Sequence, residues 1–185
     1  MTSDSLIVLI GPLKAGKSTV RDLLAAQLGW PAYSLDQLER AYIEPLGFDA
    51  ERARRIHDAE GSWAWYSYRR QYFASAVECF LSEHPAGVLE LGGGHPIAPD
   101  AVRQARIDRA LAPLPYVVLL LPHPDLAESR RILKTRQRPD RLSPDFNDHL
   151  LADDRFLRLA KHVVITARQT PEETASVVLR VTQVS

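Results

Sequence analysis

The chain has 185 residues, of which 23 are basic and 23 acidic, so its formal net charge is +0. This length suits a single domain and excludes a second full one, and the balanced charge excludes a global basic field for nucleic acid or an anionic membrane. The single cysteine, Cys79, excludes an intrachain disulfide and is expected to be buried within an apolar helical pattern. The first residues lack a basic region and a long apolar run, so we expect a cytoplasmic protein. A monomer or homodimer is a separate expectation.

The first motif covers residues 11–19, Gly-Pro-Leu-Lys-Ala-Gly-Lys-Ser-Thr, and matches the phosphate-binding pattern G-x-x-x-x-G-K-[ST]. An apolar run at 6–10 predicts a strand before it, and apolar residues at helical spacing predict a helix after it. In such a loop the backbone N–H groups and the helix N-terminus bind phosphate, whereas a chance glycine-rich turn is the alternative. The residues expected to contact ATP here are Gly11, Lys14, Ala15, Gly16, Lys17, Ser18 and Thr19.

Two residues of this motif have further expected roles. Lys17 is expected to reach the β and γ phosphates of ATP and to stabilise the charge that is transferred, and Ser18 is expected to hold Mg²⁺.

A short second strand is predicted at 30–34, followed by a helix from 35 to 42 that stops near Gly47. Asp36 opens this helix on the edge of the sheet that carries the phosphate loop. An aspartate at this place can accept the proton of a substrate hydroxyl as the oxygen attacks the γ phosphate. Capping of the helix is its alternative role.

Residues 48–81 are rich in helix formers and aromatic side chains and predict a helical insertion over the sheet. A third strand at 88–91 ends in Gly92, Gly93 and Gly94, which favour the close approach of a ligand, with a flexible turn as the alternative. Glu90 in that strand is predicted either to face the Mg²⁺ shell near Ser18 or to be a paired edge residue. His95 is expected at the surface.

The fourth and fifth strands are predicted at 116–121 and 162–166, and the last helix is predicted to begin at Thr170 as its N-cap. Between these strands lies an arginine-rich segment. It predicts a mobile lid in which Arg138 neutralises charge during transfer, and a solvated helix face is the alternative. Residues 147–154 are expected to form an exposed acidic helix. Strands that alternate with helices predict a parallel sheet wrapped by helices.

Taken in order, these motifs resemble the shikimate kinase family within the nucleoside monophosphate kinase-like P-loop proteins. The resemblance spans most of the chain and rests on 11–19, Tyr-Ser-Leu-Asp-Gln at 33–37, Leu-Gly-Gly-Gly at 91–94, Arg138-Pro139 and Ala-Arg-Gln at 167–169. It implies a three-layer α/β fold with a five-stranded parallel sheet in the order 2-3-1-4-5. It also implies one domain, 1–185, with a substrate-binding insertion at about 35–82 and a lid at about 131–155.

The resemblance implies an ATP- and Mg²⁺-dependent transfer of phosphate to the hydroxyl of a small molecule. Asp36 matches the aspartate that binds and activates the acceptor, and Arg138 matches the lid arginine. Arg131 and Arg168 lie where the family holds adenine. The residues implied to bind the acceptor are Asp36, Tyr66, Arg69, Gly92, Gly93, Gly94 and Arg155.

Two departures from the family pattern affect the expected function. Ser34 stands where the family has an aspartate at the metal shell, so Glu90 is expected to share that duty. The Phe-Arg pair that grips the shikimate carboxylate is replaced by Trp65-Tyr66, or by Tyr68-Arg69 after a shift. We therefore expect a kinase with a different acceptor. The alternatives are an antibiotic-modifying enzyme similar to chloramphenicol phosphotransferase, a true shikimate kinase, or a non-catalytic nucleotide-binding regulator.

Overall fold

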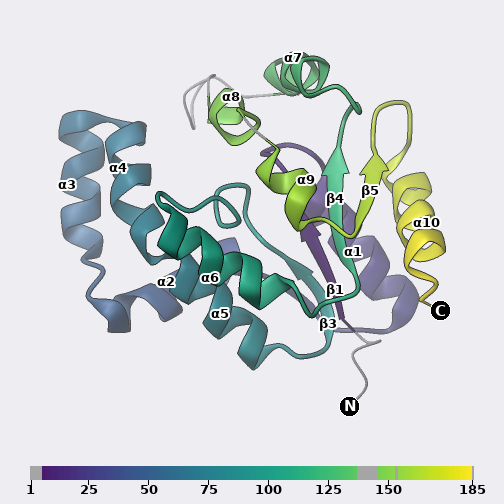
Figure 1. Cartoon of the computed structure of the whole chain (residues 1–185), viewed down its shortest axis with the longest axis horizontal. Helices are drawn as coiled ribbons and strands as arrows, with labels where there is room; N and C mark the ends of the chain where they lie inside the picture. Colours follow the sequence, from purple (N-terminus) through teal and green to yellow (C-terminus); the bar gives the residue numbers. More distant parts are fainter. Residues whose placement is uncertain (1–5, 137–145, 153, 185) are drawn as a thin grey trace.

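The computed structural model describes residues 6–136, 146–152 and 154–184. Its centre is a five-stranded sheet in the order β2-β3-β1-β4-β5, and every neighbouring pair of strands is parallel (Figure 1). The sheet and its order, predicted from the sequence, are thereby confirmed. The strands are β1 (Leu6–Ile10), β2 (Ala32–Ser34), β3 (Gly87–Glu90), β4 (Val117–Leu121) and β5 (His162–Ile165).

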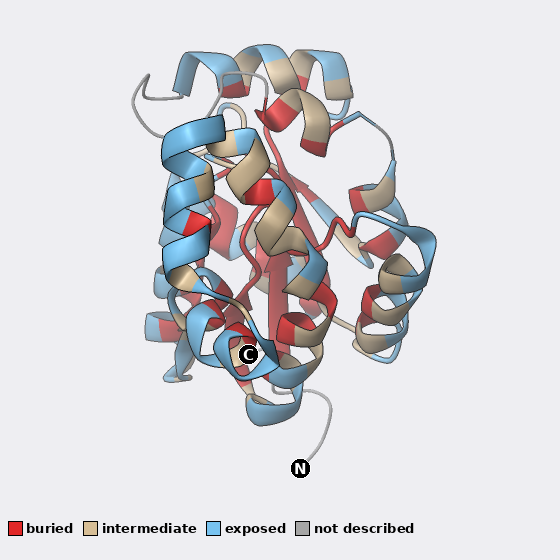
Figure 2. Ribbon diagram, turned by 90° about the vertical axis from the view of Figure 1, so that its left-hand side faces the viewer, coloured by how far each residue is buried: buried red, intermediate tan, exposed pale blue. Residues whose placement is uncertain are grey.

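Helices cover both faces of the sheet and complete three layers (Figure 1). Successive side chains of a strand point to opposite faces, so Val8 lies in one hydrophobic core and Leu9 lies in the other. The core around Leu9 is covered by α1 (Lys17–Leu28) and α10 (Pro171–Thr182), which pack against each other. Figure 2 shows the buried central strands and the exposed outer sides of the helices.

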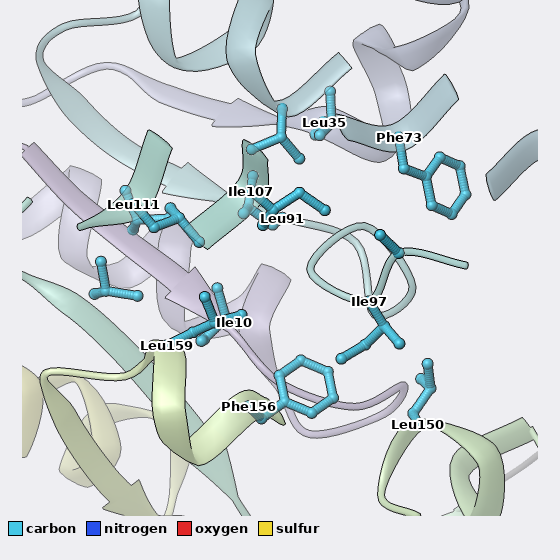
Figure 3. Packing of buried hydrophobic residues seen from close by; sticks show 14 of the residues in the cluster. Ile10, Leu35, Phe73, Leu91, Ile97, Ile107, Leu111, Leu150, Phe156 and Leu159 are labelled. Atoms are coloured by element: carbon cyan, nitrogen blue, oxygen red, sulfur yellow. The ribbon is translucent and has the colours of Figure 1, made fainter. Parts of the chain in front are cut away.

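The larger core lies on the opposite face of the sheet. Figure 3 shows Ile10 at the end of β1 close to Leu91, which follows β3, and to Phe156. The helices that contribute to this core include α6 (Ala101–Leu111) and α9 (Arg155–Leu159). Because this core holds the carboxyl end of β1 in place, it also fixes where the phosphate loop begins.

The chain between β2 and β3 is helical, as predicted. In this stretch α5 packs against α2 and α6, whereas α3 and α4 pack against each other and extend beyond the sheet (Figure 1). The elements are α2 (Leu35–Ile43), η2 (Glu44–Leu46), α3 (Ala50–Glu60), α4 (Ser62–Arg69), η3 (Arg70–Tyr72) and α5 (Phe73–Glu83).

After β4, the helices α7 (Leu126–Arg136) and α8 (Phe146–Leu150) lie beyond the carboxyl ends of the strands (Figure 1). Arg138 lies outside the described residues. No helix in the described part of the chain has the length and apolar character needed to cross a membrane.

The prediction of a buried Cys79 was wrong, because its thiol is exposed. Cys79 lies on α5, whose inward face is formed by Val77 and Phe80, both fully buried. The apolar pattern identified the helix but not the side on which the cysteine lies.

The start of α10 provides a test of the helix boundary. Thr170 Oγ1 accepts a hydrogen bond from Glu173 N at 3.2 Å, and Thr170 N donates to Glu173 Oε2 at 2.8 Å. We expect Thr170→Ala to lower the free energy of unfolding by about 1 kcal/mol, measured by urea denaturation. Ser176→Ala, which removes an exposed hydroxyl on the same helix, should leave stability near its original value. Equal losses in the two variants would contradict the capping role.

Candidate active site

The phosphate loop joins the end of β1 to the first turn of α1. Gly11 has φ 142°, and a Cβ there would lie 2.5 Å from the carbonyl oxygen of Leu120, so only glycine fits. Lys14 and Gly16 also have positive φ, at 65° and 95°. Backbone in such alternating conformations presents rows of N–H groups that bind anions. The pocket at this loop has a volume of about 490 Å³ and is lined by Leu13, Lys14, Gly16, Lys17, Ser18, Thr19, Asp36 and Glu90.

Lys17 is buried at the start of α1 and folds back onto the loop. Its Nζ donates hydrogen bonds to the carbonyl oxygens of Gly11 at 3.0 Å and Pro12 at 2.9 Å. Burial lowers the pKa of Lys17, while the charges of Glu90 and Asp36 act in the opposite direction. A phosphate in this pocket would supply the anionic partner that a buried ammonium needs.

Glu90 lies at the end of β3 and is bound from two sides by α1. Ser18 Oγ donates to its Oε1 at 2.9 Å, and Arg21 Nη1 donates to its Oε2 at 3.0 Å. Ser34 is the residue paired with Glu90 on the neighbouring strand. A carboxylate, that of Glu90, therefore lies one strand away from Ser34, and its role at the metal stays a prediction. Arg21 was not predicted, although its place one turn after Ser18 on α1 was a usable signal.

Asp36 lies in the first turn of α2 and is pressed against the loop that follows β3. A Cβ on Gly92 would lie 2.0 Å from Asp36 Oδ1, so glycine at this position allows the carboxylate its present orientation. The N-cap position of α2 belongs to Ser34, and the capping role considered for Asp36 therefore does not apply. Its carboxylate lines the phosphate-loop pocket and also a neighbouring pocket.

The neighbouring pocket, which we call the α2–α4 pocket, has a volume of about 410 Å³. It is an open pocket bordered by helices of the insertion, and its wall combines apolar side chains with charged ones. It is lined by Asp36, Glu39, Arg40, Ile43, Phe48, Ala50, Ala53, Arg54, His57, Trp65 and Arg69.

His95 is buried, with 2% of its surface exposed, and the prediction of a surface histidine was wrong. The turn after β3 folds the ring inward against Phe73, with ring centroids 4.4 Å apart. His95 Nε2 lies 2.9 Å from Glu39 Oε2, and Nδ1 lies 3.5 Å from Asp36 Oδ1. Glu39, which sequence reasoning missed, is three residues after Asp36 and therefore shares its side of the helix.

The carboxyl of Glu39 is held in its charged form. Burial opposes ionisation, but the hydrogen bonds and charges of His95 and Arg69 outweigh it and lower the pKa of Glu39. Asp36, His95 and Glu39 thus form a continuous series of polar side chains that ends at Arg69.

The next two glycines also accept close protein contacts. A Cβ on Gly93 would lie 2.8 Å from the side chain of Leu13, and one on Gly94 would lie 2.7 Å from the ring of Tyr66. Tyr66 is 3% exposed, and its hydroxyl has no hydrogen-bond partner among the described residues. The glycines therefore allow protein groups to meet closely, and their contact with an acceptor stays a prediction.

Asn147 was expected on an exposed acidic helix, but it is fully buried. Its Oδ1 accepts a hydrogen bond from Leu13 N at 2.9 Å, and its Nδ2 donates to Leu13 O at 3.1 Å. The side chain of Asn147 on α8 therefore binds both the backbone N–H and the backbone carbonyl of Leu13, in the middle of the phosphate loop. Arg136 Nη1 adds a contact to Lys14 O at 3.4 Å.

A third pocket, of about 220 Å³, lies beside the phosphate loop where β5 ends and α10 begins. Arg131 and Arg168, which were expected near adenine, do not line this pocket. Arg131 pairs with Glu128 at 2.6 Å, and Arg168 is exposed with φ 70°. Arg155 Nη1 donates to Ala98 O at 3.3 Å. The third pocket is lined by Ala15, Gly16, Thr19, Val20, Arg136, Thr166, Gln169, Pro171 and Thr174.

Known proteins resemble this chain over nearly its whole length. It is 30% identical over 178 residues to shikimate kinase of Streptomyces coelicolor, covering 96% of this chain and 95% of the relative. It is 32% identical over 191 residues to shikimate kinase of Thermobifida fusca, covering 97% and 96%. No protein-family model matches the chain.

Solved structures support the fold. Shikimate kinase from Acinetobacter baumannii in complex with shikimate has a TM-score of 0.61 and 23% identity, covering 96% of this chain and 92% of that one. Shikimate kinase from Bacteroides thetaiotaomicron has a TM-score of 0.60 and 20% identity, covering 96% and 98%.

The contact between Asn147 and the phosphate loop can be tested by substitution. Asn147→Ala leaves Leu13 N and Leu13 O without their partner, so we expect ATP to bind about tenfold more weakly, measured by calorimetric titration. The control Asp148→Asn lies on the same helix as Asn147 and weakens the ion pair of Asp148 with Lys134 of α7. It should leave ATP affinity within about twofold. Unchanged ATP affinity in a folded Asn147→Ala variant would contradict the role of Asn147.

Proposed function

Because the chain belongs to the shikimate kinase family, we propose that it transfers the γ-phosphate of ATP to a hydroxyl of a small molecule other than shikimate. The observation that carries this proposal is the position of Asp36, which lines the phosphate-loop pocket and the α2–α4 pocket. A carboxylate that faces both spaces can touch an acceptor hydroxyl and stay close to the phosphate that the hydroxyl attacks.

In the proposed reaction, the acceptor lies in the α2–α4 pocket with its hydroxyl on Asp36. The carboxylate orients the hydroxyl and takes its proton as the oxygen bonds to the γ phosphorus and the bond from this phosphorus to ADP breaks. Lys17 binds the transferring phosphate oxygens in place of the carbonyls of Gly11 and Pro12. Arg138, outside the described residues, is proposed to neutralise developing charge from the lid.

Ser18 and Glu90 fit the Mg²⁺ that this family implies. Their side chains place two oxygen atoms 2.9 Å apart on the wall of the phosphate-loop pocket, and oxygen is the ligand that Mg²⁺ prefers. Arg21 balances part of the charge of Glu90. When bound, Mg²⁺ would neutralise negative charge on the phosphates.

The remaining roles belong to the same proposal. The stretch 35–82 would form the acceptor site and 131–155 the lid of one domain, 1–185. Arg131 and Arg168 are proposed to contact adenine once ATP is bound. Of the residues proposed to contact the acceptor, two line the α2–α4 pocket, Asp36 and Arg69. The others are proposed to contact the acceptor outside that pocket: Tyr66, Gly92, Gly93, Gly94 and Arg155. Lys17 and Asp36 lie at one pocket, which argues for catalysis and against a purely regulatory nucleotide site.

We test the proposal with ATP whose γ-phosphate carries heavy oxygen, incubated with a pool of hydroxyl-bearing metabolites and antibiotics and analysed by mass spectrometry. The unmodified chain should yield a labelled phosphate ester. Asp36→Asn should lower turnover by about 10²- to 10⁴-fold because it cannot accept the proton, while ATP affinity stays within about twofold. Lys17→Ala should abolish transfer through lost stabilisation of phosphate charge.

The control is Gln37→Ala, an exposed neighbour of Asp36 on α2, which should keep the original turnover. Transfer at the original rate by Asp36→Asn would show that Asp36 is not the base. Tight ATP binding without any product would favour a nucleotide-binding regulator.

A further inference from the structure

His95 is a buried histidine beside Asp36 that the proposed mechanism does not use. Its ring packs against Phe73 of α5, with the ring centroids 4.4 Å apart. Its backbone N–H donates a hydrogen bond to Gly92 O at 3.0 Å, so His95 belongs to the turn whose glycine lies against Asp36. Backbone and ring are both held by these contacts, and the two ring nitrogens therefore have defined neighbours.

The contact with Glu39 decides which ring nitrogen of His95 carries a hydrogen. Nε2 lies 2.9 Å from Glu39 Oε2. Burial opposes ionisation of this carboxyl, but the hydrogen bonds and charges of His95 and Arg69 outweigh it and lower the pKa of Glu39. A charged carboxylate only accepts hydrogen bonds, so Nε2 is the donor. In a neutral ring the other nitrogen, Nδ1, then carries a lone pair and can accept a proton.

Nδ1 of His95 faces Asp36. It lies 3.5 Å from Asp36 Oδ1 and has no hydrogen-bond partner among the described residues. The side chain of Asp36 is 55% exposed, so a small rotation into hydrogen-bond distance is open to it. A carboxylate offers Nδ1 no hydrogen, but a carboxyl that has taken up a proton becomes a donor. The contact between Asp36 and His95 therefore strengthens when Asp36 is protonated.

The charges around these residues favour a proton on His95 once Asp36 has delivered one. The ring would then be a cation between the carboxylates of Asp36 and Glu39, and opposite charges at such short distances stabilise each other. The charged and titratable side chains around the series from Asp36 to Glu39 also include Arg69, which pairs with Glu39, Lys17, whose charge acts on Asp36, and Tyr66, whose ring lies against Gly94.

We propose that His95 is a positioning residue that acts through Asp36: its Nδ1 holds the carboxyl and receives the proton that Asp36 takes from the acceptor hydroxyl. This inference rests on the proposed function and adds a residue to its machinery.

The proton moves in two steps. As the acceptor oxygen bonds to phosphorus, its O–H bond breaks and an O–H bond forms on Asp36. That bond then breaks and an N–H bond forms at Nδ1, so Asp36 is a carboxylate again and His95 is a cation. The second step is favourable, because a carboxylic acid ordinarily gives up a proton more readily than an imidazolium does. After the product leaves, the proton returns to solvent through the half-exposed Asp36.

The first test measures phosphate transfer by His95→Gln, with the acceptor that the labelled pool identifies. The glutamine amide can still donate to Glu39 but cannot take a proton. We expect kcat to fall by about tenfold, while KM for the acceptor and affinity for ATP stay within about twofold. The matched control His162→Gln replaces a half-buried histidine of β5 and should keep the original kcat. An unchanged kcat in folded His95→Gln, or a rise in KM alone, overturns the inference.

The second test needs no acceptor and does not depend on the folding of His95→Gln. NMR of the full chain with isotope-labelled histidine, at the pH of the transfer assay, reports which ring nitrogens carry a hydrogen. We expect a hydrogen on Nε2 and a bare Nδ1, whose signal shifts in Asp36→Asn because the asparagine amide can donate to it. A hydrogen on Nδ1 in the unmodified chain, or an Nδ1 signal that Asp36→Asn leaves unchanged, overturns the inference.

The inference and the proposed function fail in different ways. Labelled product from the unmodified chain, together with an unchanged kcat in His95→Gln, contradicts the role of His95 and leaves the kinase intact. No labelled product, together with the expected NMR signals, contradicts the proposed function and supports the link between His95 and Asp36.

Discussion

The contact between Asp36 and Gly92 constrains the whole site. It brings the first turn of α2 against the loop after β3, since a Cβ on Gly92 would lie 2.0 Å from Asp36 Oδ1 and would force the carboxylate to turn away. Because β3 lies next to β1 in the sheet, the same contact sets Asp36 beside the phosphate loop. Because the strands are parallel, their carboxyl ends lie at one edge of the sheet, and a carboxylate, a lysine and a helix N-terminus come together there.

Charges around this edge are arranged in two separate sets. On the phosphate side, Glu90 is held by Ser18 and Arg21, and Lys17 rests on loop carbonyls. On the acceptor side, Glu39 is bound by Arg69 and His95. Asp36 lies between the two sets, and its side chain is 55% exposed. Our account therefore gives it a role that the buried charges cannot take, namely contact with an incoming hydroxyl.

The sequence predicted what depends on local pattern, and it missed what depends on distant packing. The loop motif and apolar strand runs identified the parallel sheet and the phosphate pocket, because their spacing encodes them directly. The order of the strands was implied by the resemblance to the shikimate kinase family. The inward turn of His95, its contact with Glu39 and the hold of Asn147 on Leu13 join residues 56 and 134 positions apart. No periodicity marks such pairs. The apolar pattern likewise did not show that Cys79 lies on the exposed side of its helix.

The central claim is that Asp36 holds the oxygen that attacks the γ-phosphate. The most direct measurement is a crystal structure of the chain with Mg²⁺, ADP and aluminium fluoride, in which an oxygen occupies the attacking position opposite ADP. Our account predicts a carboxylate oxygen of Asp36 within about 3 Å of that oxygen. An Asp36 turned away to solvent, with another side chain bound to the attacking oxygen, would contradict it.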